Sequence, residues 1–214
     1  LTKNKNEGIL MLLKKLRVKE KTCMKTGQNM KQLTELDNAV LLLLKFAKKK
    51  GMPYLTQAQV QKAIYMLQVK SREYVGEDFS NAKFIREARG PISVNVKDSL
   101  QKLASSEYGY ISTKDVQVTS ARHSFQHKLK KDFENVVSPS KALFALSTFQ
   151  ILEKNYPQFL NGKGKEVRLG SYDTAPMLKI QEKEKKAKVK FNGEPIDFDL
   201  VRLNSNIVDI IGAE

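Results

Sequence analysis

A run of apolar residues in the first quarter of the chain constrains the fold most. From Ala39 the sequence continues for six apolar residues, and four lysines come between them and the breakers Gly51 and Pro53. Thr34 is a typical N-cap. The acidic residues after it and the lysines at the far end lie where their charges interact favourably with the helix dipole. The pattern therefore predicts a helix over 34–50 that is buried on nearly all sides. The rest of the chain must cover it.

A second helix is expected directly afterwards. Thr56 is again a good N-cap, and Val60, Ile64 and Leu67 repeat at the spacing of one helix face. Gly76 is the first residue after Thr56 that favours the end of a helix. We expect an amphipathic helix between Thr56 and Gly76.

A helix and a short hairpin follow in the pattern. Pro91 excludes a continuous helix, so 83–89 is expected to be extended or a single turn, with the next helix starting near Ser93. The β-formers within 110–119 surround a turn-like pair at 114–115, which predicts a short hairpin. Three helices followed by a hairpin is the order of a winged helix.

Two more helices are expected after this hairpin. Over 120–136 the residues Phe125, Leu129 and Phe133 stand at four-residue spacing, which favours a charged amphipathic helix. Ser140 is the expected N-cap of a further helix that ends near Asn155.

The C-terminal part reads as a loop followed by β structure. Residues 161–176 are rich in Gly and Pro, and the Asn192-Gly193 pair lies between two segments of alternating apolar residues, a strong hairpin signal. We expect an α+β, mainly helical fold, winged-helix-like or Panacea-like. Its parts are a flexible basic leader over 1–33, a helical core over 34–157 with the hairpin near 110–119, and a linker with a C-terminal β-hairpin over 158–214.

The charge of the chain points to an acidic partner. Thirty-eight Lys and Arg stand against 23 Asp and Glu, which gives a net charge of +15. Nucleic acid, an anionic lipid surface and an acidic protein all fit this excess. It is densest in the leader, for which a solvated basic arm, a nucleic-acid-binding arm and a membrane-surface helix stay open.

The cysteine content and the hydropathy favour the cytoplasm. The single Cys23 supports neither an intramolecular disulfide nor a cysteine zinc site. No apolar run approaches the roughly 18–20 residues of a membrane span. We expect a cytoplasmic protein with no membrane partner.

Three segments resemble the Panacea (SocA-like) antitoxin domain of bacterial and phage toxin–antitoxin systems. They are LLLLKFAKKKG (41–51), VQKAIYML (60–67) and FIREARGPISVNVKDSLQKL (84–103), in which a Gly-Pro pair precedes a helix. The resemblance covers roughly 36–113. It implies a non-enzymatic domain that binds and neutralises a toxin protein, often encoded beside it.

The side chains give little support for an enzyme. His123 and His127 would meet on one helix face as two zinc ligands do, but no third ligand is near in the sequence. Asp197 and Asp199 are more typical of the solvated side of a hairpin. The Gly-Lys repeat at 162–165 lacks the spacing of a phosphate-binding loop. No cofactor, metal site or catalytic residue is predicted.

One cluster is a candidate partner-binding site for protein or nucleic acid. It surrounds the Gly-Pro pair, where helix N-terminal amides and basic side chains can receive a phosphate or a carboxylate. Its members are Arg86, Arg89, Gly90, Pro91, Ser93, Lys97, Gln101 and Lys102. The alternative is that the Gly-Pro pair is only a turn into a helix and the basic residues are solvated.

Two functions therefore remain in view. The first is an antitoxin-like protein that neutralises a toxin encoded nearby, which rests on the resemblance. The second is a winged-helix regulator that binds DNA, which rests on the net charge and on the order of the elements. The two are compatible, and the oligomeric state stays open.

Overall fold

The structure is a computed structural model that describes residues 32–119, 122–161 and 168–204. The chain divides into two units after Gln32, and every element discussed below belongs to the second unit, which begins at Leu33. The predicted leader over 1–33 thus lies almost entirely outside the described residues.

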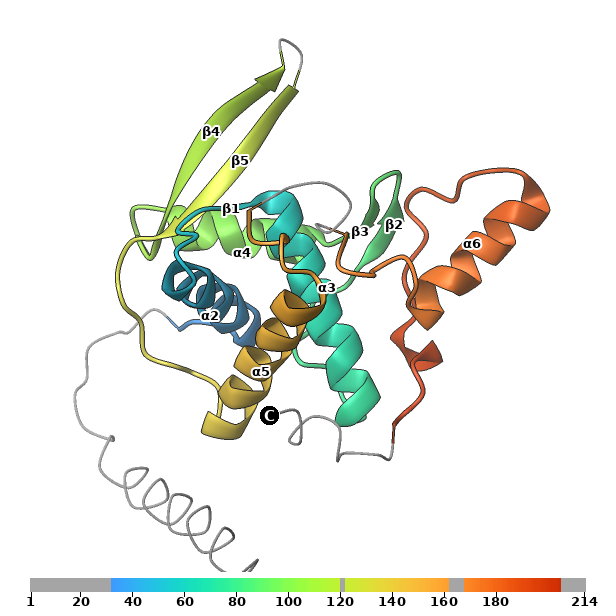
Figure 1. The fold of residues 1–214 in the computed structure, drawn as a ribbon, viewed down its shortest axis with the longest axis horizontal. Coiled ribbons are helices and arrows are strands. Elements are labelled where there is room, and N and C mark those ends of the chain that lie inside the picture. The colour runs from blue at the N-terminus through green and yellow to red at the C-terminus, as the bar shows by residue number, and fades with distance from the viewer. Residues whose placement is uncertain (1–31, 120–121, 162–167, 205–214) are drawn as a thin grey trace, which may run out of the picture. The chain divides into compact units, whose positions relative to one another are not determined.

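Helix α2 (Glu35–Lys49) is the buried helix that the apolar run predicts (Figure 1). Its start is fixed by a capping box, because the Thr34 hydroxyl accepts a hydrogen bond from the Asp37 amide at 3.1 Å while the Asp37 carboxylate accepts one from the Thr34 amide at 2.8 Å. Its apolar residues are buried and contact helices α4 and α5. Position, cap and burial are confirmed.

Helices α3 (Gln57–Tyr74) and α4 (Val94–Ala104) also begin where expected. Thr56 and Gln59 form the capping box of α3, and the Ser93 hydroxyl accepts from the Val96 amide at the start of α4. The extended segment predicted before Pro91 contains strand β2 (Ile85–Glu87), which pairs with β3 (Gly90–Ile92) in an antiparallel hairpin.

Helix α5 (Pro139–Asn155) starts slightly earlier than predicted. Ser138, not Ser140, is the N-cap, and its hydroxyl accepts from the Lys141 amide at 3.2 Å. Pro139 suits the first turn because its missing N–H would have no partner there anyway. α5 packs on α2 and α3 and covers part of the core.

A three-stranded antiparallel sheet replaces one predicted hairpin and one predicted helix. Strand β4 (Ile111–Thr119) runs straight through the expected turn at 114–115 and pairs with β5 (Arg122–Leu129). The short strand β1 (Leu55–Thr56) pairs with the other edge of β5, so the order is β1-β5-β4. The predictions of a hairpin closed within 110–119 and of a helix over 120–136 were therefore wrong.

The physical reason is that a four-residue spacing also fits a strand. Phe125, His127 and Leu129 lie on one side of β5, because alternate residues of a strand share a face. His127 and Leu129 are buried there. Pairing with β4 satisfies the backbone N–H and C=O groups of both strands. The spacing of apolar residues within one segment does not predict this pairing.

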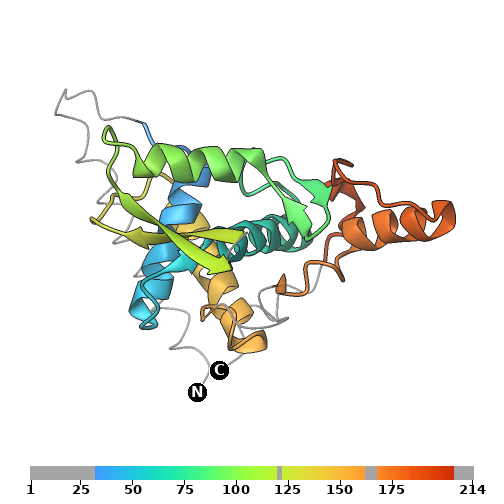
Figure 2. The same cartoon turned by 90° about the horizontal axis from the view of Figure 1, so that it is seen from above.

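The C-terminal part also differs from the prediction. Helix α6 (Ala175–Ala187) follows the expected linker, and the predicted C-terminal β-hairpin does not form. The chain turns at Asn192-Gly193, but it then pairs with β2, where the Arg86 amide donates to the Glu194 carbonyl at 2.7 Å. Figures 1 and 2 both show the β2–β3 hairpin between α3 and α6.

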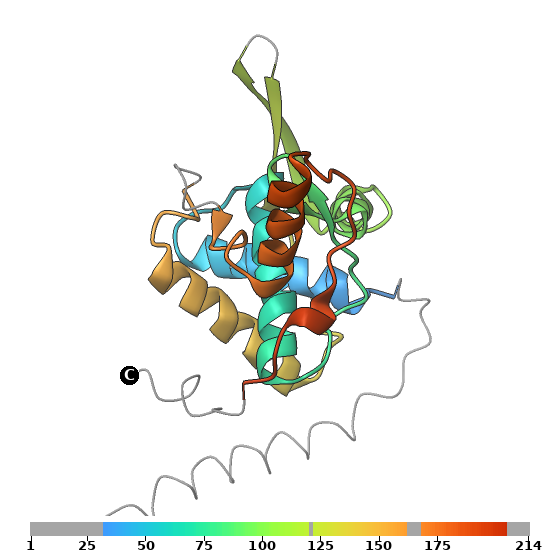
Figure 3. The same cartoon turned by 90° about the vertical axis from the view of Figure 1, so that its right-hand side faces the viewer.

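The segment after this turn belongs to the core rather than to an appendage. The short 3-10 helix η2 (Phe198–Leu200) places Phe198 against Tyr65 and Phe84, with ring centroids 5.6 and 6.0 Å apart. Tyr65 and Phe84 are themselves 5.3 Å apart. Figure 3 shows the chain passing from α6 to η2 beside α3. The expected separate C-terminal element is corrected accordingly.

The coarse prediction of a mainly helical α+β fold is confirmed. Across the residues that the structure describes, no helix has the length and apolar content to cross a membrane.

Candidate partner-binding site at the Gly-Pro hairpin

The β2–β3 hairpin is held by a close contact at Gly90. This residue has a φ of +94°, which L side chains rarely adopt, and a Cβ placed there would lie 2.9 Å from the ring of Tyr172. Only glycine allows the strand to turn here and the tyrosine to pack on it. The Gly-Pro pair is thus part of a strand that leads to α4, not the first turn of the helix itself.

Arg86 in β2 is buried, contrary to its expected place on a binding surface. It is 3% exposed and forms an ion pair with Glu184 of α6, which is 4% exposed, with 3.3 Å between Nη2 and Oε2. Its guanidinium also donates to the Glu87 carbonyl and lies 5.8 Å from the centre of the Tyr172 ring. Arg86 therefore joins the hairpin to α6.

Glu184 remains a carboxylate in this buried position. Burial raises its pKa, but hydrogen bonds from Lys190 and from the Phe191 amide, together with the charge of Arg86, outweigh that effect and lower the pKa below its ordinary value. The Lys190 contact is 3.1 Å and the Phe191 contact is 3.1 Å. The Glu184 carboxylate thus holds the end of α6 in place through its contacts with Arg86, Lys190 and Phe191.

Lys62 of α3 is a second buried cation beside Arg86. It is 5% exposed and donates to the Pro91 carbonyl at 2.6 Å. Burial, with a further contribution from the charge of Arg86, lowers the pKa of Lys62 to about 7. Sequence reasoning missed this residue because a lysine on an amphipathic helix is usually solvated.

Gln61 ties the same helix to the start of α4. Its side-chain amide donates to the Ser93 carbonyl at 2.8 Å and accepts from the Ser93 amide at 2.8 Å. Ser93 is buried, and its hydroxyl already caps α4. The helix end predicted to receive an anion is therefore occupied by the protein's own contacts.

The predicted cluster separates into inward and outward members. Arg86, Gly90, Pro91 and Ser93 are buried, while Arg89, Lys97 and Gln101 are exposed. Lys102 lies partly buried and forms an ion pair with Asp37 at 2.6 Å, where α4 meets the capping box of α2. Arg89, Lys97 and Gln101 are the members that a partner can reach, and binding through them stays a prediction.

The two histidines do not share a helix face. Both are in β5, and the imidazole of His127 is buried, with Nδ1 3.1 Å from the Thr113 hydroxyl. Burial lowers the pKa of His127 to about 4, so the ring is neutral. Within the described ranges, no group of three or more His, Cys, Asp or Glu side chains could hold a metal ion.

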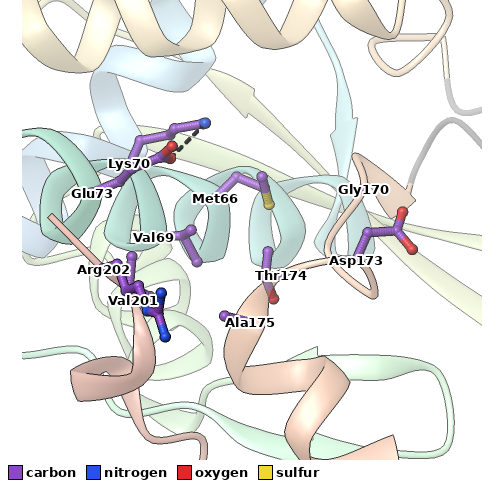
Figure 4. Close-up of a pocket in the computed structure, with 10 residues that line it drawn as sticks. All are labelled: Met66, Val69, Lys70, Glu73, Gly170, Asp173, Thr174, Ala175, Val201 and Arg202. Carbon is purple, nitrogen blue, oxygen red and sulfur yellow. Dashed lines mark hydrogen bonds and ion pairs between the residues drawn. The ribbon is translucent and has the colours of Figure 1, made fainter. Parts of the chain in front are cut away.

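A cleft of about 340 Å³ between α3 and the start of α6 was not predicted (Figure 4). Met66 and Val69 line its apolar part, and Lys70 and Glu73 pair there at 2.7 Å. Asp173 and Arg202 add one charge of each sign. The residues come from distant parts of the sequence, so no local pattern could have shown the cleft.

Comparisons with known proteins give no match. No protein-family model, no curated protein and no solved structure matches the chain.

Proposed function

We propose that this chain is a non-enzymatic, antitoxin-like protein of the cytoplasm, which binds and neutralises a toxin protein encoded nearby in a bacterial or phage system. One observation carries the proposal. Two of the segments that resemble Panacea domains, 60–67 and 84–103, contact each other through polar groups: Lys62 binds the Pro91 carbonyl, and Gln61 binds both backbone groups of Ser93.

These contacts join the two segments into one structural unit. The paired residues are about 30 positions apart, and both partners of each contact are buried. A buried lysine or glutamine needs a specific partner, so the two segments depend on each other's sequence. A resemblance that spans both segments is what such a dependence would produce.

The same unit offers a rigid basic surface for a partner. Arg89 is in the two-residue turn of the β2–β3 hairpin, and Lys97 and Gln101 are on the exposed side of α4. Their supports are the buried contacts of Arg86, Gly90 and Ser93. A surface held in this way loses little entropy on binding, and its charge suits an acidic patch on a toxin.

Co-expression with the neighbouring open reading frames tests the antitoxin function. We expect that one neighbour arrests growth when expressed alone, that this chain relieves the arrest, and that the two proteins co-purify. The proposal fails if no neighbour is toxic and none co-purifies.

A second candidate is a winged-helix regulator that binds DNA. The strand between α2 and α3 pairs with the second strand of the β4–β5 hairpin, and α4 precedes that hairpin. This order of helices and strands supports a winged helix with the β4–β5 hairpin as the wing.

Salt dependence tests this second function. For about 6–10 phosphate contacts, the affinity for duplex DNA should fall by about 10³–10⁵ between about 50 and about 200 mM salt. An affinity that is absent at low salt, or that does not change with salt, would count against DNA binding.

A further inference from the structure

The two sides of the β4–β5 hairpin have different chemistry. On the inner side, Ile111, His127 and Leu129 are buried against the helices. On the outer side, the register places Lys114 opposite Gln126 and Ser112 opposite Lys128. Lys130 follows with the same alternation just after β5 ends. We name Lys114, Lys128 and Lys130 the lysine face.

The lysine face carries charge that the fold does not use. Within the described part of the chain, no carboxylate pairs with any of its three lysines. Asp115, the acidic residue of β4, is on the opposite side of the strand. By contrast, Lys50, Lys102 and Lys141 each have a carboxylate within 2.8 Å.

An aromatic side chain extends this surface at its base. Tyr54 is 40% exposed, and the Lys128 ammonium lies 5.2 Å from the centre of its ring. A cation held over an aromatic ring has less side-chain entropy to lose on binding. Figures 1 and 3 show that the far end of the hairpin extends away from the helices, and on its outer side Lys114 and Lys130 are exposed while Lys128 is half-buried.

We propose that the lysine face, with Tyr54 at its base, binds the phosphate backbone of duplex DNA. This inference rests on the second proposed function and names the surface that provides its affinity. Lysine is a point charge suited to phosphate, and Ser112, Ser124 and Gln126 on the same side add hydroxyl and amide donors of the kind that contact phosphate. The neutral His127 on the other side contributes no charge.

On this proposal, the lysine face contributes to the affinity for DNA but not to a preference for one DNA sequence over another. Phosphate contacts position a protein on DNA but carry no sequence information. The lysine face should therefore bind duplexes of any sequence with similar strength. Loss of its charge should weaken all of them by the same factor.

The test compares two variants with equal loss of charge in the full chain. One is Lys114→Gln/Lys128→Gln/Lys130→Gln, and the control is Lys154→Gln/Lys179→Gln/Lys185→Gln, whose lysines are exposed on α5 and α6. Fluorescence anisotropy with a labelled mixed-sequence duplex of about 30 base pairs gives the affinity at several salt concentrations between about 50 and about 200 mM.

The expected result is a change in salt slope confined to the hairpin variant. Each phosphate contact contributes about 0.9 to the slope of log K against log salt, so the slope should become shallower by about 2.7. The control should keep the parental slope, and both variants should keep the parental Tm. Equal slopes in the parent and the hairpin variant would overturn this inference while DNA binding stands. No binding by the parent would instead remove the second proposed function.

A competition experiment identifies the nucleic acid. Unlabelled duplex DNA should displace the labelled probe more effectively than an equal mass of single-stranded DNA, because the duplex has the higher charge density along its axis. Equal displacement by single-stranded DNA would overturn the assignment to duplex DNA.

Discussion

The Gly-Pro junction, where the β2–β3 hairpin meets α3, α4 and α6, and the lysine face use basic side chains in opposite ways. At the junction, Arg86 and Lys62 are buried and bind Glu184 and the Pro91 carbonyl. On the lysine face, Lys114 and Lys130 are exposed, Lys128 is half-buried, and none of the three has a carboxylate partner among the described residues. A buried charge without its partner costs several kcal/mol, whereas an exposed charge contributes roughly 0–1 kcal/mol to stability. The first set therefore specifies the fold, and the second set is free to bind.

Removal of one partner from the buried ion pair should have the largest effect. We expect Arg86→Met to reduce the free energy of unfolding by about 3–5 kcal/mol, because Glu184 then keeps a buried charge with fewer partners. Urea denaturation measures this change. Lys128→Met on the lysine face is the comparison and should cost less than about 1 kcal/mol.

A double variant shows whether the pair itself is responsible. Arg86→Met/Glu184→Leu should recover most of the lost stability, since apolar residues can replace a buried ion pair at little cost. If the single variant is as stable as Lys128→Met, then Arg86 is not the link between the hairpin and α6.

The buried Lys62 should make stability depend on pH. Its pKa is about 7 in the folded protein and 10.5 when free. Between these values the unfolded chain binds more protons than the folded one, so stability should rise with pH. Below about pH 7 both states are protonated and this contribution is flat. We expect a rise of about 1 kcal/mol per pH unit between about pH 7 and about pH 9.

The control for this prediction removes the titrating group. Lys62→Met should lose that part of the pH dependence, and the difference between the two proteins isolates Lys62 from every other group. Urea midpoints measured at the same pH values give the comparison. Parallel curves for parent and variant would mean that the ammonium reaches solvent.

Gly90 should be sensitive to substitution because of its contact with Tyr172. Gly90→Ala has both an unfavourable φ and a Cβ 2.9 Å from the ring, whereas Gly51, with a φ of +79°, has nothing within 4 Å. We expect Gly90→Ala to cost about 1–3 kcal/mol more than Gly51→Ala in thermal unfolding. Equal costs would show that the tyrosine moves aside easily.

The sequence predicted the helices with strong local signals. Thr34, Thr56 and Ser93 cap α2, α3 and α4 as expected, because each start is set by residues within one turn. β5 was missed since Phe125 and Leu129 fit a helix and a strand equally well. Only pairing with β4 decides between them.

The C-terminal hairpin failed for a related reason. The turn signal at Asn192-Gly193 is real, but the partner of the following chain is β2, more than 100 residues earlier. The candidate site had the same weakness. Arg86 looked like a surface residue in the sequence, and its burial depends on Glu184, 98 positions away. Local patterns contain neither contact.

The smallest expected effect on stability belongs to the exposed members of the predicted cluster. Arg89→Glu/Lys97→Glu reverses two charges that have no buried contact, so the free energy of unfolding should change by about 1 kcal/mol or less. Binding of a toxin identified by co-expression should be lost, because reversed charges repel an acidic patch. A pull-down and a Tm measurement on the same samples separate the two effects.

Lys154→Glu/Lys179→Glu is the matched control, since it reverses two exposed lysines on α5 and α6, outside the cluster. It should keep both the Tm and the toxin. If the Arg89 and Lys97 variant binds as well as this control, the outer side of the Gly-Pro junction is a solvated surface, and the junction acts only as the frame of the fold. If the Arg89 and Lys97 variant no longer binds the toxin but keeps its affinity for DNA, the toxin-binding surface and the lysine face work independently. Their separate positions, on β2–β3 with α4 and on β4–β5, imply this result.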